Sequence, residues 1–225
     1  MTYFRDSLKR AKTYLLFIPF LALNETVIRN ESTRIYAFFL NTLAFILYAI
    51  VYGSIVEEIA LKTKSEWSHL LKRHLLNLVA ATFILYIPVF ATSYLNSEEH
   101  YLRVFAFKGL IGFVIQCATL YLMPLVFLKR KVLSSFPQAL RYIAHHLLQS
   151  TSLIALVLLG FALKYIVAAV NAYYFETEPV VIRYGFKYIH DLVSTYIGLV
   201  IFSMASSLLI SNEPSFMEVK QSNPA

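Results

Sequence analysis

The chain alternates between long apolar runs and short polar segments that carry most of its basic residues. The stretch 65–94 is the clearest example. It begins as a basic amphipathic segment and becomes, without a break, an apolar run. A helix of about 20 apolar residues is long enough to cross the hydrocarbon core of a bilayer. The pattern therefore predicts an all-α protein that crosses the membrane several times.

Six apolar runs are predicted to span or enter the membrane. They cover residues 14–28, 35–56, 75–94, 104–128, 147–173 and 192–210. The first is the weakest, because its continuous apolar part is short and contains Pro19. Such a segment either spans a locally thinned bilayer or re-enters on the same side. We expect one helical membrane domain over 1–211 with six spans, or five and a re-entrant segment, followed by a flexible tail over 212–225.

Composition points the same way. Charged residues make up 15% of the chain and hydrophobic residues 58%, whereas soluble domains carry about 25% charged residues. Many of the sixteen tyrosines lie at the ends of apolar runs, where a half-wet ring suits the membrane interface. Six glycines in 225 residues argue against glycine-rich nucleotide loops. The composition therefore favours a plasma-membrane protein, with the bacterial inner membrane as the expected location.

The basic residues predict the orientation and the partners. The net charge is +7, and the Lys and Arg residues lie beside apolar runs, so anionic lipid headgroups are a simpler partner than nucleic acid. With both termini in the cytoplasm, thirteen Lys and Arg face the cytoplasm and six face outward. This bias follows the positive-inside rule and supports six spans. Five spans would put the N-terminus outside.

Three basic segments share a spacing in which an aromatic residue precedes a leucine by four positions and a basic residue by five. They are Phe4–Lys9, Trp67–Lys72 and Phe136–Arg141. The aromatic and leucine side chains share one helix face, which suits the headgroup region. The pattern is either a three-fold repeat of an interfacial helix and a hairpin, or a chance recurrence. Contacts with lipid or a partner are expected at Phe4, Lys9, Trp67, Lys72, Arg73, Phe136 and Arg141.

Basic amphipathic helices that lead straight into spans, as in 67–77 and 136–149, resemble those of the YciC-like bacterial inner-membrane proteins. They are also similar to the membrane domains found with some glycerophosphodiester phosphodiesterases. The resemblance covers most of residues 57–210. It implies a six-helix membrane protein and no particular functional residue. The short first span and the small number of glycines depart from that pattern.

The most prominent polar residue inside a predicted span is Lys164. It follows Gly160 by four positions and precedes Asn171 by seven, so the three share one helix face. Ionisable residues within spans are candidates for function. Lys164, Asn171 and Gln116 together predict a polar path within the membrane. The alternative is structural, with the amine of Lys164 reaching the interface or forming an ion pair. Lys108, near the outer surface, is expected to reach the interface.

No arrangement typical of catalysis or metal binding emerges. Glu57 and Glu58 are expected to be a solvated helix end. The histidine pairs at 69 and 74 and at 145 and 146 lack the i, i+4 spacing of helical metal ligands. Cys117 is expected to be a small packing residue. Nucleophile elbows, phosphate loops and kinase signatures are missing from the sequence.

Two functions remain open at this stage, and neither requires a cofactor. The first is a non-catalytic scaffold or accessory subunit that packs against other membrane proteins, a second copy or lipid. The second is a small transporter or lipid-handling permease with a polar path near Lys164 and Asn171. An enzyme ranks last, because an intramembrane active site needs several polar groups at one depth, and here they are scattered along the chain.

Overall fold

A computed structural model describes residues 2–27, 34–63, 65–93, 101–129, 131–174 and 180–212. No strand occurs within these ranges, which confirms the predicted all-α class. The helices are α1 (Thr2–Thr13), α2 (Ile18–Val27), α3 (Arg34–Leu61), α4 (Trp67–Ser93), α5 (Tyr101–Ala118), α6 (Leu122–Lys129), α7 (Val132–His145), α8 (Leu147–Tyr174) and α9 (Val180–Asn212).

Three helices are long and apolar enough to cross a membrane over their described residues. They are Phe39–Leu61 in α3, Leu110–Lys129 across α5 and α6, and Tyr184–Asn212 in α9. The bent pair α7–α8 adds a fourth if it counts as one span. Six spans are therefore not confirmed. The helix α2 has ten residues and is roughly 15 Å long. It is too short to cross the membrane alone.

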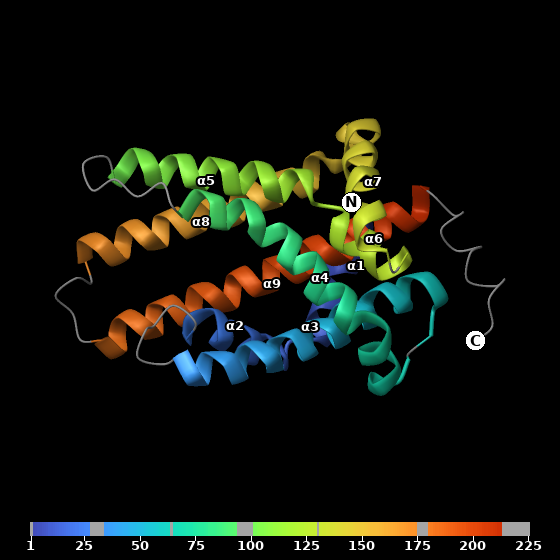
Figure 1. Cartoon of the computed structure of the whole chain (residues 1–225), viewed down its shortest axis with the longest axis horizontal. Coiled ribbons are helices and arrows are strands. Elements are labelled where there is room, and N and C mark those ends of the chain that lie inside the picture. Colours follow the sequence, from blue (N-terminus) through green and yellow to red (C-terminus); the bar gives the residue numbers. More distant parts are fainter. Residues whose placement is uncertain are drawn as a thin grey trace.

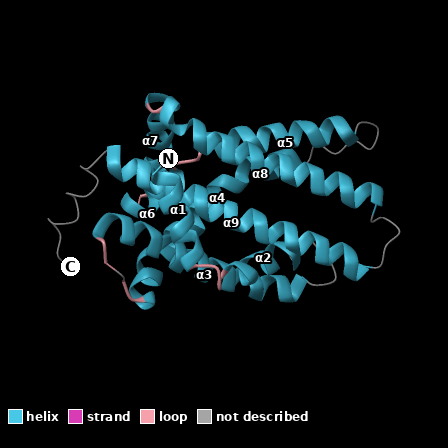
Figure 2. Cartoon of the chain, turned by 180° about the vertical axis from the view of Figure 1, so that it is seen from behind, coloured by secondary structure: helices cyan, strands magenta, loops and turns pink. Residues whose placement is uncertain are grey.

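The helices run lengthwise in a bundle, and the basic segments gather at one end of it. The turn between α3 and α4, the helix α7 and the end of α9 lie toward the right of Figure 1, and Figure 2 gives the same arrangement from behind. The helix α1 belongs to this end, because Arg10 Nη1 donates to Ser207 Oγ of α9 at 3.2 Å. The opposite end holds the last residues of α8 and the first residues of α9.

The helix at the centre of the bundle is α9. It packs against α1, α2, α3, α6 and α8, and every residue from Phe202 to Ile210 is buried. Several of these residues are small, including Ser203, Ala205 and Ser206. Small side chains let neighbouring helices approach closely, which is how helices associate when lipid competes for apolar surface.

The run 104–128, predicted as one span, breaks into α5 and α6 at a turn over residues 119–121. Pro124 explains the break. It has no N–H to donate to the carbonyl of residue 120, and its ring clashes with that carbonyl in a continuous helix. The hydroxyl of Thr119 also bonds back to the carbonyl of Ile115 at 2.6 Å, a contact that bends helices. The turn directs Tyr121, Leu125 and Phe127 into the core.

The three segments with the shared spacing take three different forms. In α4 the basic segment and the apolar run form one continuous helix, as the sequence predicts. By contrast, α7 and α8 meet at an angle of 106°, and α1 is separated from α2 by a turn over 14–17. The three-fold repeat stays a prediction.

Glu57 differs most from its expected position. The sequence predicts a solvated helix end, and this is wrong, because Glu57 is only 1% exposed. Its Oε1 accepts from Arg73 Nη1 at 2.7 Å, and its Oε2 accepts from the hydroxyl of Ser65. The ring of His74, also 1% exposed, lies with Nε2 3.7 Å from Oε1. Arg73, expected to contact lipid or a partner, instead joins α4 to α3 through this buried pair.

Gly53 allows α3 to approach α4 beside this pair. A Cβ at Gly53 would lie 2.8 Å from His74 Cδ2 and 3.1 Å from Leu70 Cδ2. The His74 ring has little freedom to move, because it stacks on Phe127 with a centroid distance of 4.7 Å. Gly53 therefore lies at the interface between α3 and α4.

We expect Gly53→Ala to lower the free energy of unfolding by about 1–3 kcal/mol through overpacking. The measurement is an unfolding titration in detergent micelles. Gly185→Ala is the matched control, because a Cβ there has nothing within 4 Å. Equal stability of the two variants would contradict the close packing of α3 on α4.

Candidate functional site

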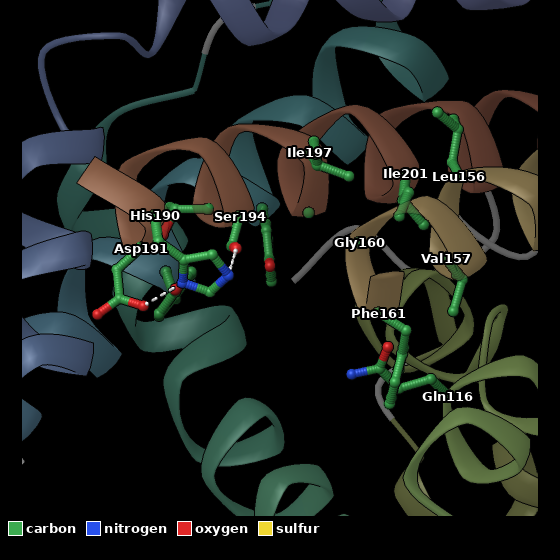
Figure 3. A pocket seen from close by; sticks show the side chains of 14 residues that line it. Gln116, Leu156, Val157, Gly160, Phe161, His190, Asp191, Ser194, Ile197 and Ile201 are labelled. Atoms are coloured by element: carbon green, nitrogen blue, oxygen red, sulfur yellow. Dashed lines mark hydrogen bonds and ion pairs between the residues drawn. The ribbon is translucent and has the colours of Figure 1, made fainter. Parts of the chain in front are cut away.

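A cavity of about 300 Å³ lies between α3, α5, α8 and α9. Figure 3 shows His190 and Ser194 on one side of it, with Gln116, Val157 and Phe161 across from them. The side chains come from helices far apart in the sequence, so the cavity is a product of the tertiary packing. Its wall combines a polar cluster with an apolar surface.

Helix periodicity explains how α9 supplies both kinds of wall. His190, Ser194, Ile197 and Ile201 are spaced by four, three and four residues, which puts them along one helix face. All four line the cavity. The stripe is polar in its first turn and apolar in the next two. On α8, Gly160 lines the cavity with no atom within 4 Å of an added Cβ.

The polar cluster is held by two hydrogen bonds and an ion pair. His190 Nδ1 lies 3.0 Å from Asp191 Oδ1, and Ser194 Oγ lies 3.2 Å from His190 Nε2. The Lys187 amine is 4.0 Å from Asp191 Oδ2. Asp191 is only 5% exposed, and a buried carboxylate needs such partners. If Nδ1–H donates to the carboxylate, Nε2 is free to accept from the serine hydroxyl.

The order Ser194, His190, Asp191 matches the hydrogen-bond order of a serine nucleophile, its base and the orienting acid. Acyl transfer also needs donors aimed at the developing oxyanion. The backbone N–H groups inside α9 already bond to carbonyls one turn earlier, so this helix offers none near Ser194. The arrangement suits hydrogen bonding to the polar part of a ligand.

No protein-family model, curated protein or solved structure matches the chain. The resemblance to YciC-like membrane proteins therefore stays a prediction. A function can be proposed only from the geometry of the chain's own residues.

Gln116, one of the three residues of the predicted polar path, lines the cavity. The side chains of Lys164 and Asn171 lie outside the described residues, as does that of Lys108. Gly160, one turn before Lys164, is in the cavity wall. The structure therefore brings Gln116 and Gly160 together and adds the cluster on α9.

The predicted interfacial residues are largely at the surface. Phe4 is 41%, Trp67 62% and Phe136 39% exposed. Lys9, Lys72 and Arg141 are exposed as well. Trp67 also packs edge-on against Phe17, with a centroid distance of 6.1 Å. Arg73 is the exception, with a side chain that is 8% exposed.

His190, Asp191 and Ser194 were not among the site residues predicted from the sequence. The last span was predicted to begin at residue 192, whereas α9 begins at Val180. The available signal was the spacing of a histidine, the adjacent aspartate and a serine one turn later. Among the described residues, no group of three or more His, Cys, Asp or Glu side chains is placed to hold a metal ion.

Proposed function

We propose that this protein is a small transporter or lipid-handling permease that binds an amphipathic molecule in the cavity between α8 and α9, without catalysing a reaction. The observation that carries the proposal is the two-sided wall. His190, Asp191 and Ser194 offer donors and acceptors, while Leu156, Phe161 and Ile201 offer apolar surface. Ligand sites typically combine a largely apolar lining with a few placed polar groups.

The proposed location is the plasma membrane of a bacterium, with both termini in the cytoplasm. The gathering of α1, α7 and the α3–α4 turn at one end of the bundle supports this orientation, because those segments carry most of the basic residues. His190 lies roughly 33 Å along α9 from Asn212, toward the other end. In this orientation the cavity belongs to the outer half of the protein.

The scaffold hypothesis stays a prediction from composition. The exposed apolar side chains of α4, such as Leu76 and Phe83, suit lipid as well as a protein partner. Purification in a mild detergent separates the two functions, since a scaffold should be recovered with a partner or as an oligomer.

Water access to the cavity is the decisive test. We expect Ser194→Cys, made in a Cys117→Ala background, to react with a membrane-impermeant maleimide added from outside. The single native cysteine is Cys117, so the background carries no other thiol. Labelling should be at least about tenfold faster than at a buried position of the same helix, because thiol reactivity requires exposure.

The control is Ser203→Cys in the same background, since Ser203 lies on α9 and is 0% exposed. A further measurement adds a fluorescent phospholipid analogue as a competing amphiphile, which should slow labelling at position 194 only. If positions 194 and 203 label equally, or if neither labels, no aqueous cavity exists at this depth and the permease proposal fails.

A further inference from the structure

The wall that α9 gives to the cavity changes from polar to apolar along the helix. His190 and Ser194 form its polar end, and Ile197 and Ile201 form its apolar end. Figure 3 shows Ile201 beside the label of Leu156 from α8, at the end away from His190. The cavity therefore has one end suited to a polar group and one suited to hydrocarbon.

The two ends of the cavity also differ in depth when α9 crosses the membrane. The candidate span of this helix begins at Tyr184. His190 lies roughly 9 Å along the axis from Tyr184, and Ile201 lies roughly 26 Å from it. The hydrocarbon core of a bilayer is about 30 Å thick. The polar end is thus near one membrane surface and the apolar end near the middle, which is the order of polarity within a lipid of one leaflet.

The size of the cavity suits one chain of a lipid. Its volume is about 300 Å³, the lower limit of the range for sites that enclose a drug-sized molecule. Ser194 and Ile201 are seven residues apart, roughly 10 Å along α9. Gly160 lines the cavity from α8, and a Cβ there would have no atom within 4 Å. The space beside this glycine is therefore open to a chain.

The hydrogen bonds at the polar end determine what Ser194 offers to a ligand. His190 Nδ1 lies 3.0 Å from a carboxylate oxygen of Asp191, so this nitrogen carries a proton. In the neutral imidazole Nε2 then accepts from the Ser194 hydroxyl, whose oxygen is 3.2 Å away. The serine proton is used in this bond, and its oxygen keeps a lone pair that accepts. The ligand group that fits is therefore a donor.

The charges beside this end favour an uncharged donor. The Asp191 carboxylate already has the Lys187 amine at 4.0 Å and the His190 ring at 3.0 Å. A further buried charge is costly unless it is paired, and a carboxylate ligand would lie against that of Asp191. A hydroxyl group donates to Ser194 without this cost.

We propose that the ligand of this cavity is a single-chain lipid with a free hydroxyl group, of the monoacylglycerol class. The proposal rests on the permease function and names its substrate. The ligand hydroxyl donates to Ser194 Oγ, and the chain lies along Ile197 and Ile201. Gly160 determines specificity, because a side chain at this position would fill the space that the chain occupies.

The test is the protection of a cysteine in the cavity wall of the reconstituted full chain. Ile197→Cys in the Cys117→Ala background is labelled in liposomes with the impermeant maleimide. We expect 1-decanoylglycerol to halve the labelling rate at about fivefold lower membrane content than methyl decanoate, which has the same chain and no hydroxyl. Didecanoylphosphatidylcholine, with two such chains, should require a higher content than 1-decanoylglycerol. Adding Ser194→Ala should make 1-decanoylglycerol and methyl decanoate equal.

The role of Gly160 is tested in the same assay. Gly160→Leu should raise the required content of 1-decanoylglycerol at least about tenfold, because the leucine fills the cavity. Gly160→Ala is the smaller step if the leucine variant folds poorly. The matched control is Gly185→Leu on α9, where a Cβ also has nothing within 4 Å. Gly185 is not among the described lining residues, so its variant should be protected as the Ile197→Cys protein is.

The outcomes separate this proposal from the permease function. If Ser194→Cys is labelled as expected but methyl decanoate or the two-chain lipid protects Ile197→Cys as well as 1-decanoylglycerol does, the assigned ligand is wrong and the permease function stands. The same holds if position 194 is labelled and position 197 is not. Equal weakening by Gly185→Leu would overturn the role of Gly160. If neither position is labelled, both proposals fail.

Discussion

Replacing Glu57 by alanine is expected to lower the free energy of unfolding by about 3–5 kcal/mol, the largest effect of any single substitution considered for this chain. The reason is the position of Arg73, whose side chain is 8% exposed and 2.7 Å from the Glu57 carboxylate. Removing that carboxylate leaves a guanidinium with little water and without its bound counter-ion. The hydroxyl of Ser65 also loses the oxygen to which it donates.

The adjacent residue gives a matched control. Glu58 is 40% exposed and lies 3.5 Å from Arg10, so Glu58→Ala should cost less than about 1 kcal/mol, as exposed pairs do. Unfolding titrations in detergent micelles would measure both variants. A double variant, Glu57→Ala/Arg73→Leu, should recover part of the loss, because it removes the uncompensated charge as well. If Glu57→Ala costs no more than Glu58→Ala, the buried pair does not hold α3 to α4.

The all-α class and the long apolar helices could be predicted from the sequence, because a bilayer restricts the structures that can cross it. A segment in hydrocarbon must satisfy its own backbone groups, so a long apolar run is read as a helix with little ambiguity. The continuous helix α4, with its basic start and apolar end, follows from that rule. The break between α5 and α6 does not follow from hydropathy, because Pro124 sits within an apolar run and only its missing N–H identifies the bend.

The polar sites could not be predicted for a different reason. Hydropathy treats a polar residue near a helix end as solvated, whether or not it has a partner. Glu57 and Arg73 are 16 residues apart, and only the packing of α3 on α4 makes them a pair. His190 bonds to Asp191 and Ser194, which are one and four positions away. The spacing of these three residues was therefore visible in the sequence. What the sequence lacked was the cavity, which needs α3, α5 and α8 in place.

The ring of Phe127 on α6 contacts aromatic side chains of three other helices, and these contacts underlie the second large effect. It is 1% exposed, and its ring stacks on His74 of α4 at 4.7 Å. It also meets Tyr52 of α3 edge-on at 5.9 Å and Phe202 of α9 at 5.8 Å. This side chain therefore joins the short helix α6 to α3, α4 and α9.

We expect Phe127→Ala to lower the free energy of unfolding by about 2–4 kcal/mol, measured by the same titration in detergent micelles. This loss of unfolding free energy is smaller than for the same substitution in a soluble core. Lipid or detergent is as apolar as the protein interior, so the loss comes mainly from the cavity that the substitution leaves. Phe83→Ala on α4 is the control, since Phe83 is 69% exposed and its removal leaves no internal cavity. Phe127→Leu should lie between the two, because it keeps much of the buried volume. A loss for Phe127→Ala no greater than for Phe83→Ala would mean that contacts other than this aromatic group hold α6 in the bundle.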